Sequence, residues 1–166
     1  MMRDTDKALE ILTQALDLER RGQNFYRQAA REVSGEKGRD VFASLADDEE
    51  KHAAMIERQM RALQEQRQYE PVPGIRAPDI DLDRRLFPPE GETREAEFEG
   101  DINVLDALHF ALDIEMRAHS LYTDAAKKTE DEEGKKLYMW LADAELTHFD
   151  LLMTNYESQV TMGGWV

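Results

Sequence analysis

The amino-acid sequence predicts an all-α protein, an antiparallel four-helix bundle with a long crossover between its second and third helices. All five prolines fall within residues 71–89. Proline is costly inside a helix, so this cluster marks a connection. On both sides of it, apolar residues recur at three- and four-residue steps over dozens of positions. Glycine-bearing turns at residues 34–38 and 130–134 divide each side into two helices.

The first helix pair is expected over about residues 4–68. Asp4 or Thr5 is placed to cap the first helix, because short polar side chains accept hydrogen bonds from free backbone N–H groups. The turn between the two helices is short, so they are antiparallel neighbours. The apolar positions of this pair are Leu9, Leu12, Leu16, Tyr26, Ala29, Ala30, Val33, Phe42, Leu45, Ile56 and Leu63.

The crossover is expected over about residues 69–100 and the second helix pair over about residues 101–160. Asp101 is placed to cap the third helix. Helices of about 25–30 residues are roughly 40 Å long at 1.5 Å per residue. The two pairs form one domain over residues 1–166, in agreement with a mass of 19.2 kDa. The apolar positions of the second pair are Leu105, Leu108, Leu112, Tyr122, Ala125, Ala126, Tyr138, Leu141, Leu152 and Tyr156.

The two helix pairs repeat each other at an offset of 96 residues. Between residues 9–30 and 105–126, ten of 22 positions are identical. Between residues 38–52 and 134–148, six of 15 are identical, and no gap is needed across the first turn. An internal duplication is the simplest explanation, and it predicts pseudo-twofold symmetry.

Charge and composition exclude several classes of function. The net charge of -15 disfavours binding to nucleic acid or to an anionic membrane surface. Cysteine is absent, which excludes disulfides, thiolate nucleophiles, iron–sulfur clusters and rubredoxin-type metal sites. No stretch approaches the ~20 apolar residues of a membrane span. A soluble, cytoplasmic protein is expected.

Six side chains are polar at positions where a bundle core is normally apolar. Glu19 lies among Leu12, Leu16 and Tyr26 on one helix face, and Glu115 occupies the matching position of the repeat. The second and fourth helices each carry Glu-x-x-His, whose three-residue step places both side chains on one face. The two motifs fall in register in the repeat. The six residues are Glu19, Glu49, His52, Glu115, Glu145 and His148.

The alternative is that these six residues are solvated on the surface of a highly charged protein. Each one, however, is flanked by apolar residues on its own face. Unpaired buried carboxylates cost several kcal/mol each and repel one another, and no lysine or arginine occupies the core-facing positions. Four carboxylates and two imidazoles leave two divalent ions formally neutral. This is the ligand set of di-iron and di-manganese helical bundles.

The sequence around these residues resembles the ferritin-like domain of the rubrerythrin family. The resemblance is carried by Glu19, by Phe25 and Tyr26, and by the run ADDEEKHA at residues 46–53. The second half carries the pattern again, from Glu115 to His148. Both helix pairs are covered, whereas the crossover and residues 161–166 lie outside the resemblance.

The resemblance implies that two glutamates bridge two metal ions and that one further glutamate and one histidine complete each site. The bridging residues would be Glu49 and Glu145, and the completing pairs would be Glu19 with His52 and Glu115 with His148. Tyr26 and Tyr122 would have a catalytic role by donating hydrogen bonds to carboxylates and so tuning the chemistry of the site. Their alternative role is that of amphipathic core tyrosines.

Two features depart from the family pattern. The cysteines of a C-terminal rubredoxin-like iron site are missing. Ala118 stands where the family carries a further glutamate, one turn after the third-helix ligand. His119 is within reach of the site but is expected to be an ordinary polar helix residue. His109 lies off the ligand face and is expected to be structural.

One aspartate has two open interpretations. Asp48 directly precedes Glu49 and is placed to orient a ligand histidine. Its counterpart in the repeat is Ala144, and an aspartate on a helix surface needs no site. Both interpretations stay open at the level of sequence.

The leading functional hypothesis is a rubrerythrin-like redox enzyme that reduces hydrogen peroxide to water at a diferrous site. An external electron donor, rubredoxin-like or other, would restore the site. The alternatives are a ferroxidase or iron-binding protein that uses O₂ and a di-metal oxygenase acting on an organic substrate. Iron is the expected metal, with manganese, zinc or mixed occupancy left open. A homodimer is expected. In one possible form of this dimer, each bundle contains one helix pair from each of the two chains.

Overall fold

The computed structural model describes residues 4–75, 78, 80–83 and 103–166, and within them the chain forms helices and no strand. This confirms the all-α prediction. α1 packs against α2, α3 against α4, and α1 against α3. None of the helices within these described residues is long and apolar enough to cross a membrane. The helices are α1 (Asp4–Glu32), α2 (Glu36–Gln66), α3 (Val104–Lys128) and α4 (Glu132–Met162).

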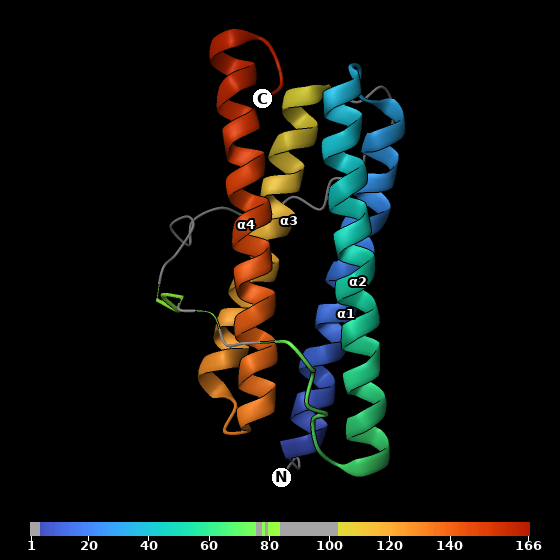
Figure 1. The fold of residues 1–166 in the computed structure, drawn as a ribbon, viewed down its shortest axis with the longest axis vertical. Helices are drawn as coiled ribbons and strands as arrows, with labels where there is room; N and C mark the ends of the chain where they lie inside the picture. The colour runs from blue at the N-terminus through green and yellow to red at the C-terminus, as the bar shows by residue number, and fades with distance from the viewer. Residues whose placement is uncertain (1–3, 76–77, 79, 84–102) are drawn as a thin grey trace.

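The four helices lie lengthwise beside one another as an antiparallel bundle (Figure 1). α1 and α2 run in opposite directions, as do α3 and α4. α3 begins at the end of the bundle opposite to the end at which α2 finishes (Figure 1). The connection between them therefore has to span the length of the bundle, as the predicted crossover requires.

Short polar side chains fix where two of the helices begin. The side chain of Asn103 accepts hydrogen bonds from two backbone N–H groups of the first turn of α3, at 2.9 and 3.4 Å. The prediction that Asp101 caps this helix is wrong, because Asn103 is the cap; Asp101 itself lies outside the described residues. Asp131 caps α4 by accepting from the backbone N–H of Gly134 at 2.8 Å. The prediction that Asp4 or Thr5 caps α1 is wrong, because both residues already lie inside the helix.

The apolar core consists of two clusters, one towards each end of the bundle. The Leu12 cluster contains Leu12, Ala15, Ile56, Leu63, Tyr69, Ala118, Tyr122, Ala125, Ala126, Leu137, Tyr138, Leu141 and Ala142. The Leu108 cluster contains Phe25, Tyr26, Ala29, Val33, Phe42, Leu45, Ala46, Ala107, Leu108, Ala111, Leu112, Phe149 and Leu152. The offset of 96 residues exchanges the two clusters, for example Leu12 for Leu108 and Tyr138 for Phe42. This agrees with the pseudo-twofold symmetry that the repeat predicts.

An aromatic side chain follows α2 and another follows α4, and each packs on the opposite helix pair. The Tyr69 ring lies 6.1 Å from that of Tyr138, and the Trp165 ring lies 5.8 Å from that of Phe42, both at 83°. A Cβ atom at Gly134 would come within 2.6 Å of the Tyr69 ring. A Cβ atom at the counterpart, Gly38, would come within 2.5 Å of Trp165. Residues 161–166, outside the family resemblance, thus follow the repeat in space.

A buried amide holds each of these exit segments by its backbone. The side-chain oxygen of Gln59 accepts from the N–H of Glu70 at 2.9 Å, and its nitrogen donates to the Glu70 carbonyl at 2.9 Å. The counterpart, Asn155, accepts from the N–H of Val166 at 3.0 Å. The repeat is therefore preserved in hydrogen bonding as well as in apolar packing.

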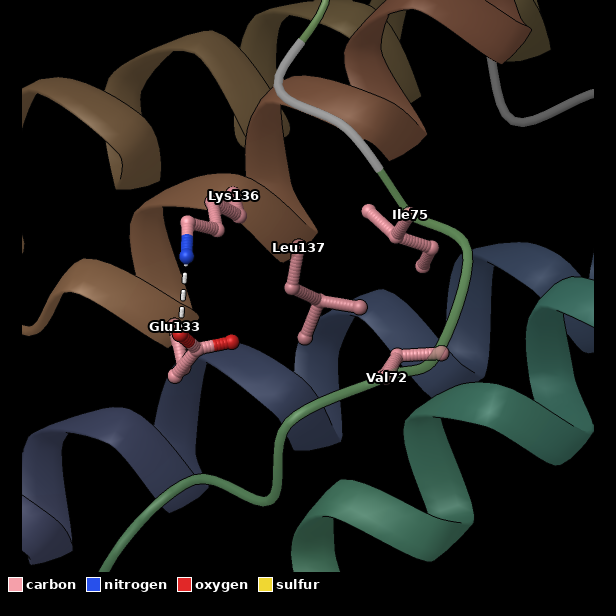
Figure 2. Close-up of a pocket in the computed structure, with 5 residues that line it drawn as sticks. All are labelled: Val72, Ile75, Glu133, Lys136 and Leu137. Atoms are coloured by element: carbon pink, nitrogen blue, oxygen red, sulfur yellow. Dashed lines mark hydrogen bonds and ion pairs between the residues drawn. The ribbon is translucent and has the colours of Figure 1, made fainter.

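The start of the crossover lies along α4. Val72 and Ile75 face Leu137, and Glu133 pairs with Lys136 at 2.8 Å beside them (Figure 2). The hollow between these five residues has a volume of about 10 Å³. That is about the room that one water molecule requires, so this hollow is too small for an organic substrate.

Candidate metal centre

The six residues singled out in the sequence come together between the two apolar clusters. α1 contributes one of them, α3 one, and α2 and α4 two each. All six are buried, with at most 6% of their surface exposed. They are Glu19, Glu49, His52, Glu115, Glu145 and His148.

The helical register explains why these side chains face inward. Leu45 and Leu141, fully buried in the core, each precede a Glu-x-x-His motif by four residues on the same face. Glu50, one residue beyond Glu49, is about 100° further round the helix and is exposed. The apolar packing of the two clusters therefore fixes which carboxylates enter the core.

The six side chains form two groups that share two carboxylates. One group consists of Glu19, Glu49, His52 and Glu145, and the other of Glu49, Glu115, Glu145 and His148. Within each group, the four possible ligand atoms lie within 4.8 Å of one another. The shared residues are Glu49 and Glu145, the two that the family resemblance assigns as bridges. Their binding of metal stays a prediction.

Each histidine directs its Nδ1 atom at the carboxylates. Nδ1 of His52 lies 3.3 Å from oxygens of Glu19 and Glu49 and 3.1 Å from Glu145. The ring planes of His52 and His148 are nearly parallel, at 22°, with centroids 5.6 Å apart. Both rings thus face the same acidic centre.

The second histidine repeats this arrangement. Nδ1 of His148 lies 3.2 Å from Glu49, 3.6 Å from Glu115 and 3.5 Å from Glu145. Each of the shared glutamates is therefore within reach of both imidazoles.

The donor set fits a pair of divalent cations. Glu49 Oε1, Glu115 Oε2, Glu145 Oε1 and His148 Nδ1 are buried and make no hydrogen bond within the described residues. Among those residues, no lysine or arginine is buried to compensate the carboxylates. Carboxylate oxygen and imidazole nitrogen are ligands that divalent iron, manganese and zinc accept. Two such cations would satisfy the uncompensated atoms and neutralise their charge.

Bound protons offset part of the negative charge of the metal-free cluster. Burial, followed by the charge of Glu145, raises the pKa of Glu19 and of Glu115 well above the usual range. Burial alone would lower the pKa of both histidines, but the surrounding carboxylates outweigh it and raise that pKa. Glu49 and Glu145 shift the other way, because burial raises their pKa but their hydrogen bonds and the histidines outweigh it and lower that pKa. Glu19, Glu115 and the histidines therefore hold protons when no cation is bound, and a cation has to displace them.

Two buried tyrosines connect the halves of the cluster. Tyr122 of α3 donates its hydroxyl hydrogen to Glu19 of α1, and Tyr26 of α1 donates to Glu115 of α3. Burial and the neighbouring carboxylates raise the pKa of both phenols well above its ordinary value. They therefore remain protonated donors. These are the hydrogen bonds that the family resemblance implies, while a catalytic role for the tyrosines stays a prediction.

Asp48 contacts a histidine of the opposite helix pair. Nε2–H of His148 donates to Asp48 Oδ2 at 3.2 Å, and Lys51 donates to Asp48 Oδ1 at 3.1 Å. Partial burial raises the pKa of Asp48, but these two partners outweigh it and lower the pKa. Of its two open interpretations, the structure favours the one in which Asp48 orients a histidine.

The remaining histidines lie outside the two groups. His109 is exposed and stacks on Tyr156, with ring centroids 4.7 Å apart, in agreement with a structural role. His119 is 3% exposed, more buried than the expected polar helix residue, because it lies one turn from Glu115 on the inner side of α3. Neither residue belongs to a possible metal-ligand group.

Trp140 touches the site and was not found by sequence reasoning. Its ring lies 5.5 Å from that of His52 at an angle of 78°. The repeat carried no signal for it, because the counterpart of Trp140 is Ser44. The only cue in the sequence was its place five residues before Glu145.

Comparisons with known proteins bear on the family and on the fold. A family model described as rubrerythrin matches residues 10–85, which include Glu19, Glu49 and His52, and this confirms the resemblance for the first helix pair. The match also includes residues 69–85 of the crossover, which were expected to lie outside the resemblance. A solved structure described as a hypothetical protein from Pyrococcus furiosus is similar, with 26% sequence identity and a TM-score of 0.65. That similarity covers 92% of this chain and 90% of the other. No curated protein matches the chain.

Proposed function

We propose that this chain, whose residues 10–85 match the rubrerythrin family model, is a di-iron oxidoreductase that reduces hydrogen peroxide to water. The observation that carries the proposal is the pair of buried ligand groups sharing Glu49 and Glu145. Reduction of one peroxide consumes two electrons and two protons and yields two water molecules. A bound pair of Fe(II) ions supplies one electron per ion, which matches this demand.

The side chains of the site would divide the work of holding the two cations. Glu49 and Glu145 would be shared between them. Glu19 with His52, and Glu115 with His148, would complete the two sets of ligands. The carboxylates supply four negative charges, so two divalent cations leave the ligand set neutral. The apolar clusters on both sides limit the access of water along the bundle axis.

Proton supply has a structural basis on one side of the site. Asp48 has 40% of its side chain exposed and accepts a hydrogen bond from the buried His148. It therefore links the edge of the site to solvent. At the centre, Tyr26 donates its phenolic hydrogen to Glu115 and Tyr122 donates to Glu19, the two glutamates that the ligand groups do not share. Asp48 can support proton delivery to a reacting oxygen, whereas the two phenols, whose pKa is raised, would stay protonated and hold the carboxylates in place.

Electrons would come from outside the chain. The sequence contains no cysteine, so it cannot build the rubredoxin-like iron site that typical rubrerythrins carry. We propose a rubredoxin-like protein or a small reductant as the donor.

A second candidate, a ferroxidase or iron-binding protein, is favoured by one observation. Ala118 occupies the place of the additional family glutamate and is buried in the Leu12 cluster. The ligand groups therefore rest on four glutamates within the described residues. Such a site would oxidise Fe(II) with O₂ without sustained turnover of peroxide.

Stopped-flow kinetics after anaerobic loading with Fe(II) separates the two candidates. We expect repeated turnover of hydrogen peroxide when a reductant is present, and a slower reaction with O₂. Stoichiometric oxidation of Fe(II) by O₂ without peroxide turnover would favour the second candidate. Glu145→Ala should abolish the reaction, and the exposed Glu50→Ala should retain it. Peroxide consumption that is unchanged in Glu145→Ala would contradict the proposal.

We also propose that the protein is a homodimer. In this structure one chain supplies all six ligands, so exchange of helix pairs is a further form of the dimer and not a requirement of the site. Light scattering should give a mass of about 38 kDa, twice the 19.2 kDa of one chain. A mass near that of one chain would contradict the dimer, and a mass many times larger would favour iron storage.

A further inference from the structure

The inner residues of the site follow the repeat, but the residues around them do not. All six ligands and both tyrosines have an identical counterpart 96 residues away. Several neighbouring positions differ between the halves, among them Gly22, which lies beside Glu49, and its counterpart Ala118. The pairs that differ around the histidines are Ser44 and Trp140, Asp48 and Ala144, and Lys51 and Thr147. The two histidines therefore have identical inner neighbours and different outer ones.

His148 is held by a carboxylate on its outer side. Its Nε2–H donates to Asp48 at 3.2 Å, and the other oxygen of Asp48 accepts from Lys51 at 3.1 Å. Because Nε2 carries the proton, the lone pair of a neutral imidazole is on Nδ1, the atom that faces the glutamates. The ring orientation and the tautomer are both suited to binding a cation.

His52 has a different support. The position that corresponds to Asp48 is Ala144, whose methyl side chain accepts no hydrogen bond. The His52 ring packs instead on Trp140, edge to face, at a centroid distance of 5.5 Å. This contact restrains the ring by packing, and it does not provide a carboxylate that would make the imidazole a stronger donor to a cation.

We propose that these outer residues make the two cation sites inequivalent, with the site of Glu115 and His148 binding its divalent ion more tightly than the site of Glu19 and His52. Asp48 is the positioning residue that creates the difference. The inference rests on the di-metal site of the proposed function. It does not depend on peroxide being the substrate.

The size of the effect follows from the role of the outer carboxylate. A carboxylate that accepts a hydrogen bond from a ligand histidine fixes the ring and raises its basicity, and its removal costs about 10–100-fold in metal affinity. Asp48 should therefore increase the affinity of one site by about this factor. The two cations share Glu49 and Glu145, so the two wild-type affinities alone do not show how much Asp48 contributes. Substitutions at Asp48 and at its counterpart Ala144 measure that contribution.

Titration of the metal-free protein with Mn(II), followed by the EPR signal of free Mn(II), measures both affinities. Asp48→Ala should lower the affinity of the tighter Mn(II)-binding step about 10–100-fold and leave the affinity of the weaker binding step nearly unchanged. Asp48→Asn, which keeps the shape without the charge, should give an intermediate loss. Asp47→Ala, at an exposed neighbouring position, is the matched control and should bind as the wild type does.

The reciprocal substitution tests the proposal in the other direction. Ala144→Asp places a carboxylate at the position next to His52 that corresponds to Asp48, and it should tighten the weaker step. In crystals with one equivalent of Mn(II), anomalous density should concentrate beside Glu115 and His148. In the double variant Asp48→Ala, Ala144→Asp it should move to Glu19 and His52.

The outcomes separate this inference from the proposed function. If the wild-type protein binds no Mn(II), the di-metal site itself fails. If it binds two ions and Asp48→Ala weakens both steps equally or neither, only the inequivalence is overturned. Equal anomalous density at both positions with one equivalent of Mn(II) would overturn it as well. Circular dichroism and thermal unfolding of each metal-free variant show whether it is folded.

Discussion

The ends of the bundle and its centre are built from opposite kinds of side chain. The Leu12 and Leu108 clusters consist of aliphatic and aromatic side chains, and each fully buried leucine in them contributes about 1.5–3 kcal/mol to folding. The centre between them holds four glutamates and two histidines with almost no exposed surface. Buried carboxylates without a counter-charge cost several kcal/mol each. The ends therefore stabilise the fold, whereas the charge of the centre has to be offset by protons or by a bound cation.

This difference shows how the two roles are separated along one chain. Substitutions at the ends should change the free energy of unfolding and leave metal binding intact. Substitutions at the centre should change metal binding first. The exits of α2 and α4 extend the apolar ends, because Tyr69 and Trp165 pack there on the opposite helix pair.

The largest expected effect is the loss of metal from the centre. Glu49→Ala and Glu145→Ala should each remove most of the bound metal, because each deletes a ligand shared by both groups. Metal content per chain after loading and desalting, measured by plasma mass spectrometry, checks this. Glu50→Ala should retain two ions, since its side chain is exposed. Equal loss in Glu50→Ala would contradict the assignment of the inner face.

Substitutions at the ends should give the opposite pattern. Leu12→Ala and its counterpart Leu108→Ala remove fully buried side chains and should lower the free energy of unfolding by about 2–5 kcal/mol. The two losses should be similar, since the positions are equivalent in the repeat. Chemical denaturation measures them, and metal stoichiometry should stay at two ions per chain. A loss of metal in the folded variants would show that ends and centre are not separable.

The pH dependence of stability should differ between the metal-free and metal-loaded protein. The pKa of Glu19 and of Glu115 is raised in the folded state, so their protonated forms are favoured there. Their contribution to stability is present below the unfolded pKa near 4.5 and is lost as the pH rises through the folded pKa. The histidines act in the same direction above about pH 6.5, because their pKa is raised too.

A bound cation replaces these protons, so its stabilising effect should grow as the pH rises. Each displaced proton contributes about 1.4 kcal/mol per pH unit. Thermal unfolding with and without Mn(II) at pH 5 and pH 8 should therefore show a larger increase in Tm at pH 8. The same increase at both values would argue against a buried carboxylate site.

The smallest expected effect concerns the aromatic exits. Gly134→Ala places a Cβ atom 2.6 Å from the Tyr69 ring and should destabilise the protein by about 1–3 kcal/mol through overpacking. Gly38→Ala should do the same against Trp165. Gly164→Ala, where a Cβ atom would meet nothing within 4 Å, is the matched control. Unfolding curves that coincide for all three variants would contradict the packing of the exits.

The sequence predicted the inner face of the bundle well, because helical spacing and the repeat report the same residues twice. Glu19 and Glu115 stood out as charges among leucines, and the structure places both in the centre. Features without a repeated counterpart were harder to predict: the role of Asp48 stayed open, and Trp140 was missed. The counterpart of Trp140 in the repeat is Ser44. The packing of Trp140 on His52 depends on the distance between two helices, which no spacing within one helix reveals.

Local competition between neighbouring residues explains the remaining differences. Asp101 and Asn103 are both good capping residues, and only the position at which α3 begins decides between them.

Residues 161–166 share little sequence with residues 65–70. Their common geometry, with left-handed caps at Arg67 and Gly163, arises from packing across the bundle.

The most direct test of the central claim is anomalous diffraction from crystals of the metal-loaded protein, collected at the absorption edge of the metal. We expect two ions per chain, one beside Glu19 and His52 and the other beside Glu115 and His148, with Glu49 and Glu145 contacting both. A single ion, ions bound only at surface carboxylates, or a centre that stays metal-free after loading would contradict the claim.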